Sequence, residues 1–444
     1  MSTTRLETDY LVIGAGAMGL AFVDVILAEH RTARVVIVDR HASPGGHWND
    51  AYPFVRLHQP AAFYGLNSTN LGQGGEDLVC GPEIVAYFRT AMDRFLATGR
   101  VQYLPMSEYQ GDGRIVSLVE DGRVTQVTVL RRIVDGTYMK VEVPSVVAPR
   151  YEVDPDVTLV PPNGLPQVKR PWERYVVLGA GKTGIDAILF LLDQGVSPDR
   201  IQWVVSNDAW LWQRATVQPG GVLKTITAFV ESVASATNID EVFLRLERQG
   251  IVARVDTGSL PTKWRCATVG RSELAGLRQI KDVVRMGRVQ RVSRDKMQLD
   301  RGTVEAVEDT LFVDCSSNGL AKSTPLPVFA DGRIVLQSVF MCQQTFSAAL
   351  IAHLELMGLS DDKRNEICVA VPHPERKEDL LAALITSTLN VIKWNRHLPL
   401  WLRRSRLNLG HEDPVHHYLR AAVKMTLLYR RAAAAMDRML APTG

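Results

Sequence analysis

The pattern that most constrains this chain is a glycine-rich motif that follows a short apolar run near the N-terminus. Residues Tyr10–Ile13 predict a buried parallel strand, and glycines spaced GxGxxG follow it before a helical stretch. Gly14 permits a tight turn, Gly16 lets the backbone approach a pyrophosphate, and Gly19 lets helix and strand pack closely. Asp39, at the end of the next apolar run, can accept hydrogen bonds from a ribose. The order of these features predicts a βαβ dinucleotide-binding unit.

The same pattern recurs in the middle of the chain. An apolar run ending at Leu178 is followed by glycines at the same spacing and then by an apolar helix face. Two copies predict two bound dinucleotides, one in each of two Rossmann-like domains. The embedded Gly-Lys-Thr is not a triphosphate-binding loop, because the first glycine that such a loop requires would fall at Val176. The residues expected to contact the second dinucleotide here are Gly179, Gly181, Lys182, Thr183 and Gly184.

Length and composition indicate a soluble enzyme. The 444 residues, 46% of them hydrophobic, suffice for two or three domains. A net charge of +3, from 51 basic and 48 acidic residues, gives no reason to expect nucleic-acid binding. No signal peptide or membrane-spanning run is visible, which favours a cytoplasmic protein. The cysteines show no CxxC spacing and are expected to be reduced; they are Cys80, Cys266, Cys315, Cys342 and Cys368.

A segment rich in glycine and aromatic residues follows the ribose-binding acid. Gly45 and Gly46 give flexible backbone, and Trp48 adds a flat apolar surface with an indole donor. Taken alone, such a segment is more often a surface loop that buries its tryptophan. Together with the two glycine motifs, it resembles the flavin-containing monooxygenase and Baeyer-Villiger group of two-dinucleotide-domain flavoproteins, in which a GGxW segment lies along FAD.

The resemblance implies FAD in the first domain and NADPH, with NADH as the alternative, in the second. It also implies that His58 and Gln59 lie near the reacting face of the flavin. Two features depart from the family pattern: the strand ending at Asp314 is not followed by ATG, and no FxGxxxH signature precedes the second glycine motif. Besides the first glycine motif and Asp39, the residues implied to hold FAD are Arg40, Gly46, His47, Trp48 and Arg56.

The strand after the second glycine motif should carry the residues that choose between NADPH and NADH. A 2′-phosphate favours a basic residue there, whereas a free ribose hydroxyl favours a carboxylate. Ser206 at the strand end and Arg214 beyond it fit a phosphate, while Asp208 between them would favour NADH. Because Asp208 lies beyond the position equivalent to Asp39, we expect NADPH, with Arg214 supplying much of the preference.

A further strand and helix are expected within residues 333–358, with the helical pattern starting at Thr345. In the resembling family, the N-terminus of a helix at this place points at the pyrimidine side of the flavin, where reduction builds negative charge. The resemblance therefore implies that Gln343, Gln344 and Ser347 lie near the ring, with Gln344 among the catalytic residues.

The remaining patterns complete an α/β fold with two Rossmann-like domains. A helix is expected over residues 81–100, a small antiparallel β-meander over 113–147 and an irregular crossover over 147–171. The expected parts are an FAD-binding domain of residues 1–170 and 311–375, an NAD(P)H-binding domain of residues 171–310 and a C-terminal helical extension of residues 376–444.

These features predict a flavoprotein monooxygenase. The resemblance implies transfer of one oxygen atom from O2 to a small organic substrate through a flavin hydroperoxide. An FAD-dependent oxidoreductase that only moves hydride, or a non-catalytic nucleotide-binding regulator, would show the same motifs. No metal site is predicted, because His411, His416 and His417 lack a ligand spacing. Pro399 interrupts the C-terminal extension, which favours a cap over the substrate cleft or a contact between copies over a membrane-surface helix.

Overall fold

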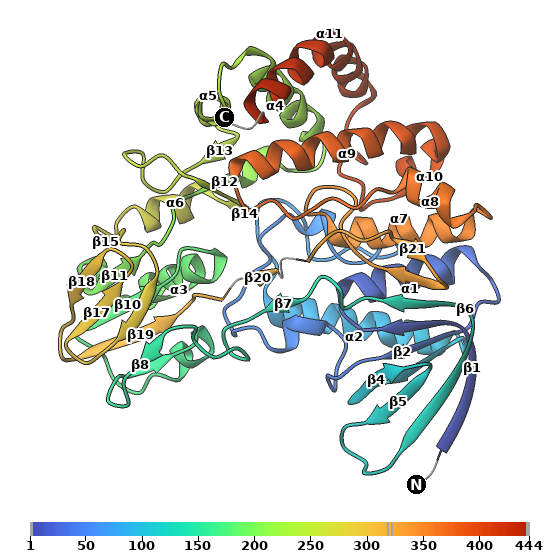
Figure 1. The fold of residues 1–444 in the computed structure, drawn as a ribbon, viewed down its shortest axis with the longest axis horizontal. Helices are drawn as coiled ribbons and strands as arrows, with labels where there is room; N and C mark the ends of the chain where they lie inside the picture. The colour runs from blue at the N-terminus through green and yellow to red at the C-terminus, as the bar shows by residue number, and fades with distance from the viewer. Residues whose placement is uncertain (1–2, 318, 321–322, 441–444) are drawn as a thin grey trace.

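The computed structural model describes residues 3–317, 319–320 and 323–440, and it contains two mainly parallel sheets (Figure 1). The first sheet has the order β21-β22-β6-β1-β2-β3, with β5 attached to β6 and β4 to β5. Its strands are β1 (Thr3–Ile13), β2 (Val35–Val38), β3 (Val101–Leu104), β4 (Ser107–Gly111), β5 (Arg114–Ser117), β6 (Val124–Asp135), β21 (Phe329–Ala330) and β22 (Arg333–Val335).

Helices from both ends of the chain cover this sheet. The helix α1 (Ala17–Glu29) packs against α2 (Gly81–Ala97) and against α7 (Gln344–Leu356), and all three contribute to one hydrophobic cluster. The short α8 (Asp361–Ile367) contacts β21. Because α7 lies far beyond α1 in the sequence, a late segment of the chain packs back onto elements of its N-terminal part.

The second glycine motif forms the centre of the other parallel sheet, with the order β15-β11-β10-β19-β9. These strands are β9 (Leu159–Val160), β10 (Arg174–Leu178), β11 (Ile201–Val204), β15 (Asp282–Val284) and β19 (Thr310–Asp314). The helices α3 (Lys182–Asp193) and α6 (Arg271–Leu277) pack together beside it. A separate sheet contains β8 (Glu152–Val153), β16 (Val289–Val292), β17 (Lys296–Leu299) and β18 (Gly302–Glu305).

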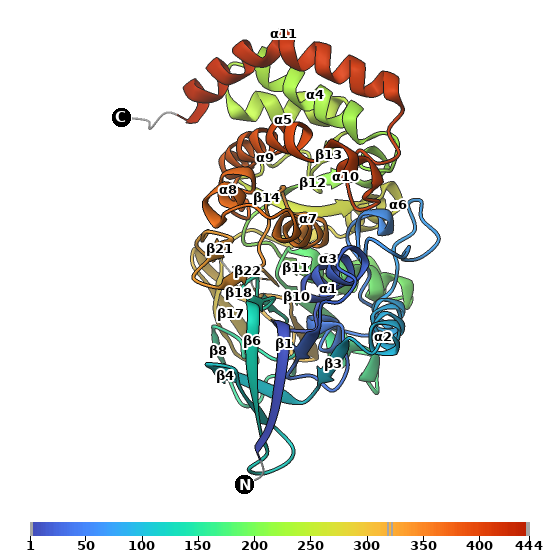
Figure 2. The same ribbon diagram turned by 90° about the vertical axis from the view of Figure 1, so that its right-hand side faces the viewer.

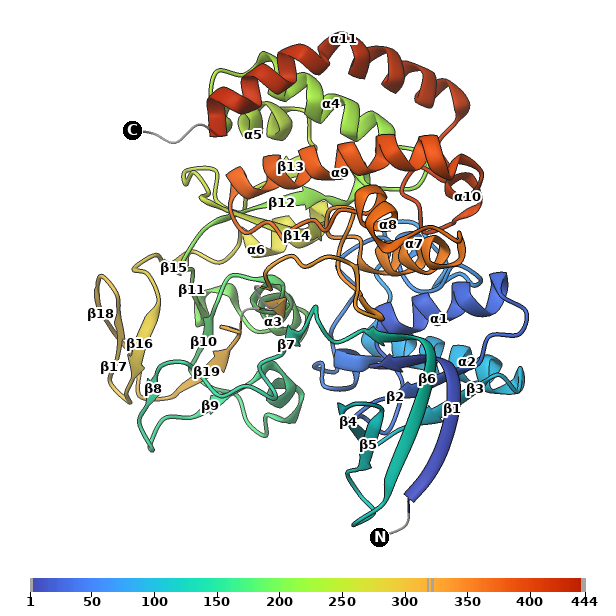
Figure 3. The ribbon, with the colours of Figure 1, turned by 45° about the vertical axis from the view of Figure 1, so that its right-hand side comes forward.

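The C-terminal extension packs on an insertion in the second domain. In Figures 2 and 3, α11 lies over α4, and α9 lies between α11 and α7. Residues of α4, α5, α9 and α11 share a hydrophobic cluster with residues of a small sheet. None of the described helices is long and apolar enough to cross a membrane. The elements are α4 (Val222–Ser235), α5 (Ile239–Arg248), α9 (Lys377–His397), α10 (Pro399–Arg404), α11 (Val415–Leu440), β12 (Ala209–Gln213), β13 (Val252–Ala253) and β14 (Lys263–Val269).

Three expected boundaries differ from the structure. The strand β19 pairs with β10, so the second sheet extends to Asp314 instead of ending at residue 310. The antiparallel meander is formed by β4, β5 and β6 and therefore begins at Ser107. The crossover over residues 147–171, expected to be irregular, supplies the edge strands β8 and β9. The strand β7 (Val141–Glu142), which precedes this crossover, pairs with β20 (Gly319–Leu320), which follows β19. Hydrophobic pattern alone did not identify these two-residue strands, because they are too short to show a period.

Candidate functional site

The first glycine loop has the backbone geometry that its sequence predicts. Gly14 has φ of 95°, in the region that favours glycine. A Cβ on Gly19 would overlap the carbonyl oxygen of Gly14, so only glycine allows α1 to approach the strand this closely. In contrast, a Cβ on Gly16 would meet only the Cα of Gly46, at 3.7 Å. The backbone at Gly16 is therefore accessible to a ligand.

The start of α1 fits an anionic group. Gly16 precedes α1, and no side chain caps the first N–H groups of the helix. The segment containing Gly45 and Gly46 closes on this loop, since the Gly45 N–H donates a 2.8 Å hydrogen bond to the Ala15 carbonyl. Gly46 has φ of 56°, and a Cβ there would lie 3.0 Å from the Cα of Gly16. This close backbone approach fits the pyrophosphate of a dinucleotide.

Asp39 is buried beside the loop and organises it. Its carboxylate accepts hydrogen bonds from the N–H groups of Ala15, at 2.5 Å, and His41, at 2.7 Å. The imidazole of His41 lies between Asp39 and Asp50, and the hydrogen bond that it donates to the Asp39 carboxylate is the main cause that raises the pKa of His41 to about 9. Arg40, implied to hold FAD, instead has a side chain that is 73% exposed and lies 3.5 Å from Glu108.

The aromatic residues of the next segment point inward. Trp48 is only 8% exposed, and its indole N–H donates a 2.7 Å hydrogen bond to the Tyr64 hydroxyl. Trp48 thus packs in the core, as the buried-tryptophan alternative predicts. The His47 ring lies 5.0 Å from the Trp48 ring, and burial lowers the pKa of His47 to about 4. His47 is therefore neutral at pH 7.

Two residues implied to lie near the flavin have side chains that are engaged elsewhere. Arg56 is exposed, and its guanidinium donates a 3.2 Å hydrogen bond to the Leu78 carbonyl. The Gln59 amide donates to the Phe63 carbonyl at 3.3 Å. Arg56 is therefore corrected to a surface residue, because its backbone pairs with the strand-like segment before α2 and directs the side chain outward.

His58 lies at the junction of the two halves. Its carbonyl oxygen accepts hydrogen bonds from the Thr268 hydroxyl, at 2.6 Å, and the Thr268 N–H, at 3.0 Å. Burial is the main cause that lowers the pKa of His58 to about 4, with smaller contributions from Lys182, His47 and His373. His58 consequently presents a neutral imidazole close to residues of both dinucleotide-binding halves.

The second glycine loop repeats the geometry of the first. Gly179 has φ of 123°, and a Cβ there would overlap the carbonyl oxygen of Cys315. A Cβ on Gly184 would overlap the carbonyl oxygen of Gly179, whereas a Cβ on Gly181 would meet no atom within 4 Å. No side chain caps the first N–H groups of α3. The loop can therefore hold a second pyrophosphate.

A buried ion pair follows this loop. The Lys182 ammonium pairs with the Asp186 carboxylate, and the Tyr52 hydroxyl donates a 2.7 Å hydrogen bond to the same carboxylate. Burial raises the pKa of Asp186, and the charge of Lys182 opposes that shift. Thr183 lies beside Lys182 in the first turn of α3.

A cavity of about 410 Å³ lies at the carboxyl ends of β11 and β15, where an adenosine is expected in this fold. Ala180 of the glycine loop lines it, together with Asp208 and Arg285. The Asp208 carboxylate accepts a 2.9 Å hydrogen bond from Arg285, which neutralises its charge. Arg278 and Lys281 also line the cavity, as does Asp256, which pairs with Arg285 at 3.0 Å, so basic and acidic side chains share its walls with apolar ones.

Arg214 does not line this cavity, and its predicted contact with a 2′-phosphate is wrong. The side chain is 7% exposed; its guanidinium pairs with Glu273 and donates to the Thr268 hydroxyl at 3.2 Å. The chain after β12 carries Arg214 toward the half that contains the first glycine loop, where its guanidinium lies 3.5 Å from the Glu76 carbonyl oxygen. Ser206 is half-buried just after β11 and does not line the cavity either.

The start of α7 contains an unsatisfied acceptor. Among the described residues, the Gln343 side-chain oxygen is buried without a hydrogen-bond partner. Such a group is costly, so it marks a place where a donor on a bound molecule would fit. Gln344 begins α7 and is half-buried. Ser347 is corrected to a structural residue, because its hydroxyl donates to the Gln343 carbonyl at 2.6 Å and accepts from the Val339 N–H at 3.0 Å.

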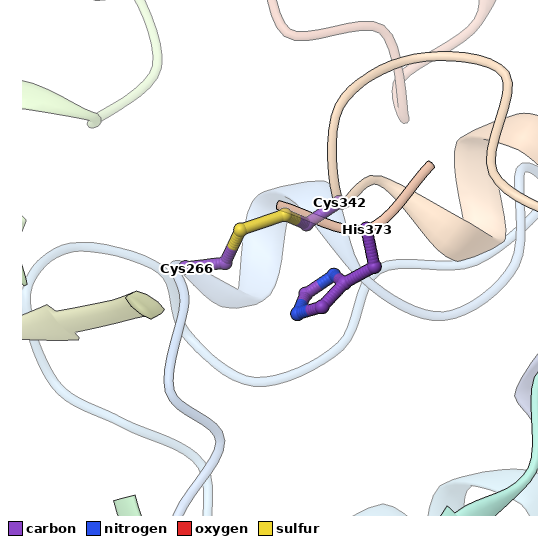
Figure 4. A group of neighbouring side chains, drawn as sticks. All are labelled: Cys266, Cys342 and His373. Atoms are coloured by element: carbon purple, nitrogen blue, oxygen red, sulfur yellow. A yellow bond between two sulfur atoms is a disulfide. The ribbon is translucent and has the colours of Figure 1, made fainter. Parts of the chain in front are cut away.

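The expectation that all cysteines are reduced is wrong for two of them. Cys266 in β14 and Cys342 before α7 form a disulfide, and the His373 imidazole lies beside it (Figure 4). The two cysteines lie 76 positions apart in the sequence, so no local spacing could reveal the pair. The group of Cys266, Cys342 and His373 also shows no metal-ligand spacing in the sequence, because its members come from separate segments. The free thiols are Cys80, Cys315 and Cys368.

Uncharacterized mycobacterial proteins are similar to nearly the whole chain. Protein Rv2000 of Mycobacterium tuberculosis and protein Mb2023 of Mycobacterium bovis are each 44% identical over 446 residues. The alignments cover 96% of this chain and 82% of each relative. No protein-family model matches the chain.

Solved structures share the fold at low sequence identity. Cyclohexanone-bound cyclohexanone monooxygenase in the rotated conformation matches with a TM-score of 0.50 and 12% identity, over 82% of this chain and 87% of its own. Polycyclic ketone monooxygenase of Thermothelomyces thermophila matches with a TM-score of 0.53 and 11% sequence identity. The match covers 98% of this chain and 89% of that protein. Oxidized steroid monooxygenase bound to NADP matches with a TM-score of 0.50 and 14% sequence identity. The match covers 97% of this chain and 98% of that protein. The chain belongs to the family of the mycobacterial proteins and has the fold of Baeyer-Villiger-like flavin monooxygenases.

Proposed function

We propose that this protein is an FAD-dependent, NAD(P)H-using monooxygenase that adds one oxygen atom from O2 to a small organic substrate. The observation that carries the proposal is the hydrogen bond between Tyr52 and Asp186. Tyr52 follows Gly46 closely in the FAD half, and Asp186 follows Gly184 closely in the nicotinamide half. Two uncapped helix N-termini therefore open toward one junction, as a reaction between two dinucleotides requires.

The residues present fit both cofactors. FAD would lie on the backbone of Gly14, Gly16 and Gly46, and the nicotinamide cofactor would lie on Gly181 with its adenosine in the cavity beside Asp208. When bound, FAD supplies the hydride acceptor and the oxygen chemistry, while the protein supplies position and exclusion of water.

The side chains at the junction would bind and orient these groups. Gln343 offers a hydrogen-bond acceptor that no described residue uses. His58, neutral at pH 7, can donate one hydrogen bond and accept another. Gln344 lies at the N-terminus of α7, where the helix dipole favours negative charge. We assign His58 and Gln344 to substrate or cofactor contact, and we assign Gln59 to positioning of the segment.

We infer that NADPH is the preferred nicotinamide cofactor. Arg278, Lys281 and Arg285 give the adenosine cavity a basic wall. Arg285 pairs with both Asp208 and Asp256, which weakens the repulsion that these carboxylates would exert on a 2′-phosphate. These residues replace Arg214 in the selection of the cofactor.

The test is oxygen transfer itself. Purified protein is incubated with NADPH, isotopically labelled O2 and a panel of ketones and sulfides, and the products are analysed by mass spectrometry. Label in a product supports the monooxygenase. NADPH oxidation that depends on FAD but leaves every product unlabelled would support a hydride-transferring oxidoreductase instead. A protein that binds no FAD and oxidises no NAD(P)H would support a nucleotide-binding regulator.

A further inference from the structure

Three side chains that bind soft metals converge from separate segments near the junction. The ligand atoms of Cys266, Cys342 and His373 all lie within 4.8 Å of one another (Figure 4). His373 stands between Pro372 and Pro374, whose rings restrict the backbone of the loop. We propose that Cys266, Cys342 and His373 form a site for a thiophilic divalent cation such as Zn²⁺, which becomes available when the disulfide is reduced.

Backbone hydrogen bonds hold the three segments in register. The Trp264 N–H donates to the Glu375 carbonyl at 2.8 Å, which fixes β14 beside the His373 loop. The Val371 N–H donates to the Ser338 carbonyl at 2.8 Å, which fixes the same loop beside the segment that leads to α7. The ligands are therefore held together by bonds other than the disulfide, so reduction leaves them close.

The donor set suits zinc. In tetrahedral sites Zn–S is about 2.3 Å and Zn–N about 2.0–2.1 Å, so the ligand atoms lie roughly 3.5 to 3.8 Å apart. After reduction the two sulfur atoms must move apart from bonding distance, whereas the His373 nitrogen already lies within 4.8 Å of both. The two negative charges of the thiolates equal the charge of a divalent cation, and the imidazole adds a neutral ligand. The group has three members among the described residues, which leaves a fourth position for water.

Reduction breaks the S–S bond between Cys266 and Cys342 with two electrons and two protons and yields two thiols. A water-soluble phosphine supplies the electrons and becomes a phosphine oxide, with its oxygen and the two protons coming from water. Cation binding then releases the two thiol protons to solvent.

The experiment uses Co²⁺ as the probe. The full-length protein is reduced with the phosphine, desalted without oxygen and titrated with Co²⁺. Tetrahedral thiolate coordination is detected by ligand-field absorption at wavelengths beyond the oxidised flavin bands, and bound zinc is counted by plasma mass spectrometry in a parallel sample. We expect one cation per chain. Cys266→Ser and His373→Ala should weaken binding by at least about a hundredfold, since even loss of an outer partner costs 10–100-fold.

Cys80→Ser is the matched control, because it removes one thiol away from the group and should bind Co²⁺ like the wild type. Circular dichroism checks that each variant is folded. The proposal is overturned if reduced wild type takes up no Co²⁺, or if the disulfide resists the phosphine. Uptake that persists in folded Cys266→Ser and His373→Ala would also overturn it. None of these readouts depends on oxygen transfer, so the cation site and the proposed function fail independently.

Discussion

Tyr52 donates a 2.7 Å hydrogen bond to Asp186, and this bond joins the segment after the first glycine loop to the helix that begins at the second. Both groups are buried, and burial raises the pKa of each. The Asp186 carboxylate is compensated by Lys182 and by Tyr52, as a buried charge requires. The two glycine loops therefore meet at one junction, while the backbone of each loop, at Gly16 and at Gly181, has open space of its own, so each loop can be altered separately.

Substitution Gly16→Val should give a folded protein without FAD. Gly16 has φ of −79°, which valine adopts easily, and the new side chain would fill space where the pyrophosphate must approach. The measurement is the ratio of flavin to protein absorbance after purification, with circular dichroism as the check of folding. Normal FAD content in the folded variant would remove the first loop from the FAD site.

Substitution Gly181→Val should leave FAD bound but stop its reduction by NAD(P)H. A side chain at Gly181 meets no protein atom within 4 Å, so the variant tests ligand space in the second loop alone. Anaerobic bleaching of the flavin absorbance after addition of NADPH reports the effect. Loss of FAD with retained nicotinamide binding would mean that FAD binds the second glycine loop and the nicotinamide cofactor the first.

Removal of Arg285 should reduce the preference for NADPH. The Arg285→Ala variant loses a charge-assisted contact to the phosphate and leaves Asp208 unpaired beside it. Such a contact is worth roughly 1.5 to 3 kcal/mol, so the ratio of kcat/KM for NADPH over NADH should fall about tenfold to a hundredfold. The control is Arg271→Ala, which alters an exposed arginine outside the cavity. If the ratio of kcat/KM for NADPH over NADH changes in Arg214→Gln but not in Arg285→Ala, Arg214 is the residue that selects the cofactor.

His41 should stabilise the fold at low pH and not at high pH. Its folded pKa of about 9 lies above the ordinary value of 6.5, so the stabilisation is complete below about pH 6.5 and is lost as pH rises through 9. Because the side chain is 32% exposed, we expect a contribution of only about 1 to 2 kcal/mol. Urea unfolding of the wild type and His41→Gln should differ by this amount at pH 6 and converge at pH 10. The exposed His397→Gln serves as the control, and a difference that persists at pH 10 would contradict the assignment.

Arg406 should be essential for stability. Its guanidinium donates 2.7 Å hydrogen bonds to the carbonyls of Ala62, Tyr64 and Leu66. Arg406→Ala should lower the free energy of unfolding by about 2 to 4 kcal/mol, because it leaves acceptors unpaired as well as removing the bonds. Arg404→Ala, at an exposed position nearby, should change it by less than about 0.5 kcal/mol. Equal denaturant midpoints for the two variants would show that the three bonds contribute nothing.

The sequence predicted those parts whose requirements are local. Gly19 and Gly184 are needed because a nearby carbonyl leaves no room for a side chain, and their spacing is visible in the sequence. Arg214 was misplaced because its partner Glu273 lies 59 positions away and the course of the intervening chain decides where the charge goes. The pairing of Cys266 with Cys342 depends on the docking of two domains, which no local pattern encodes.

The packing of α11 on α4 has a consequence for how the chain is made. Glu231 and Lys424 pair in the finished protein, yet 193 positions separate them. At synthesis rates of 5–20 residues per second, α4 emerges roughly 10 to 40 s before its cover. During that interval Phe229 and Phe243, both buried at the end, lack the apolar neighbours that α11 provides. Phe229 and Phe243 therefore stay less covered until α11 has been synthesised and has packed on α4.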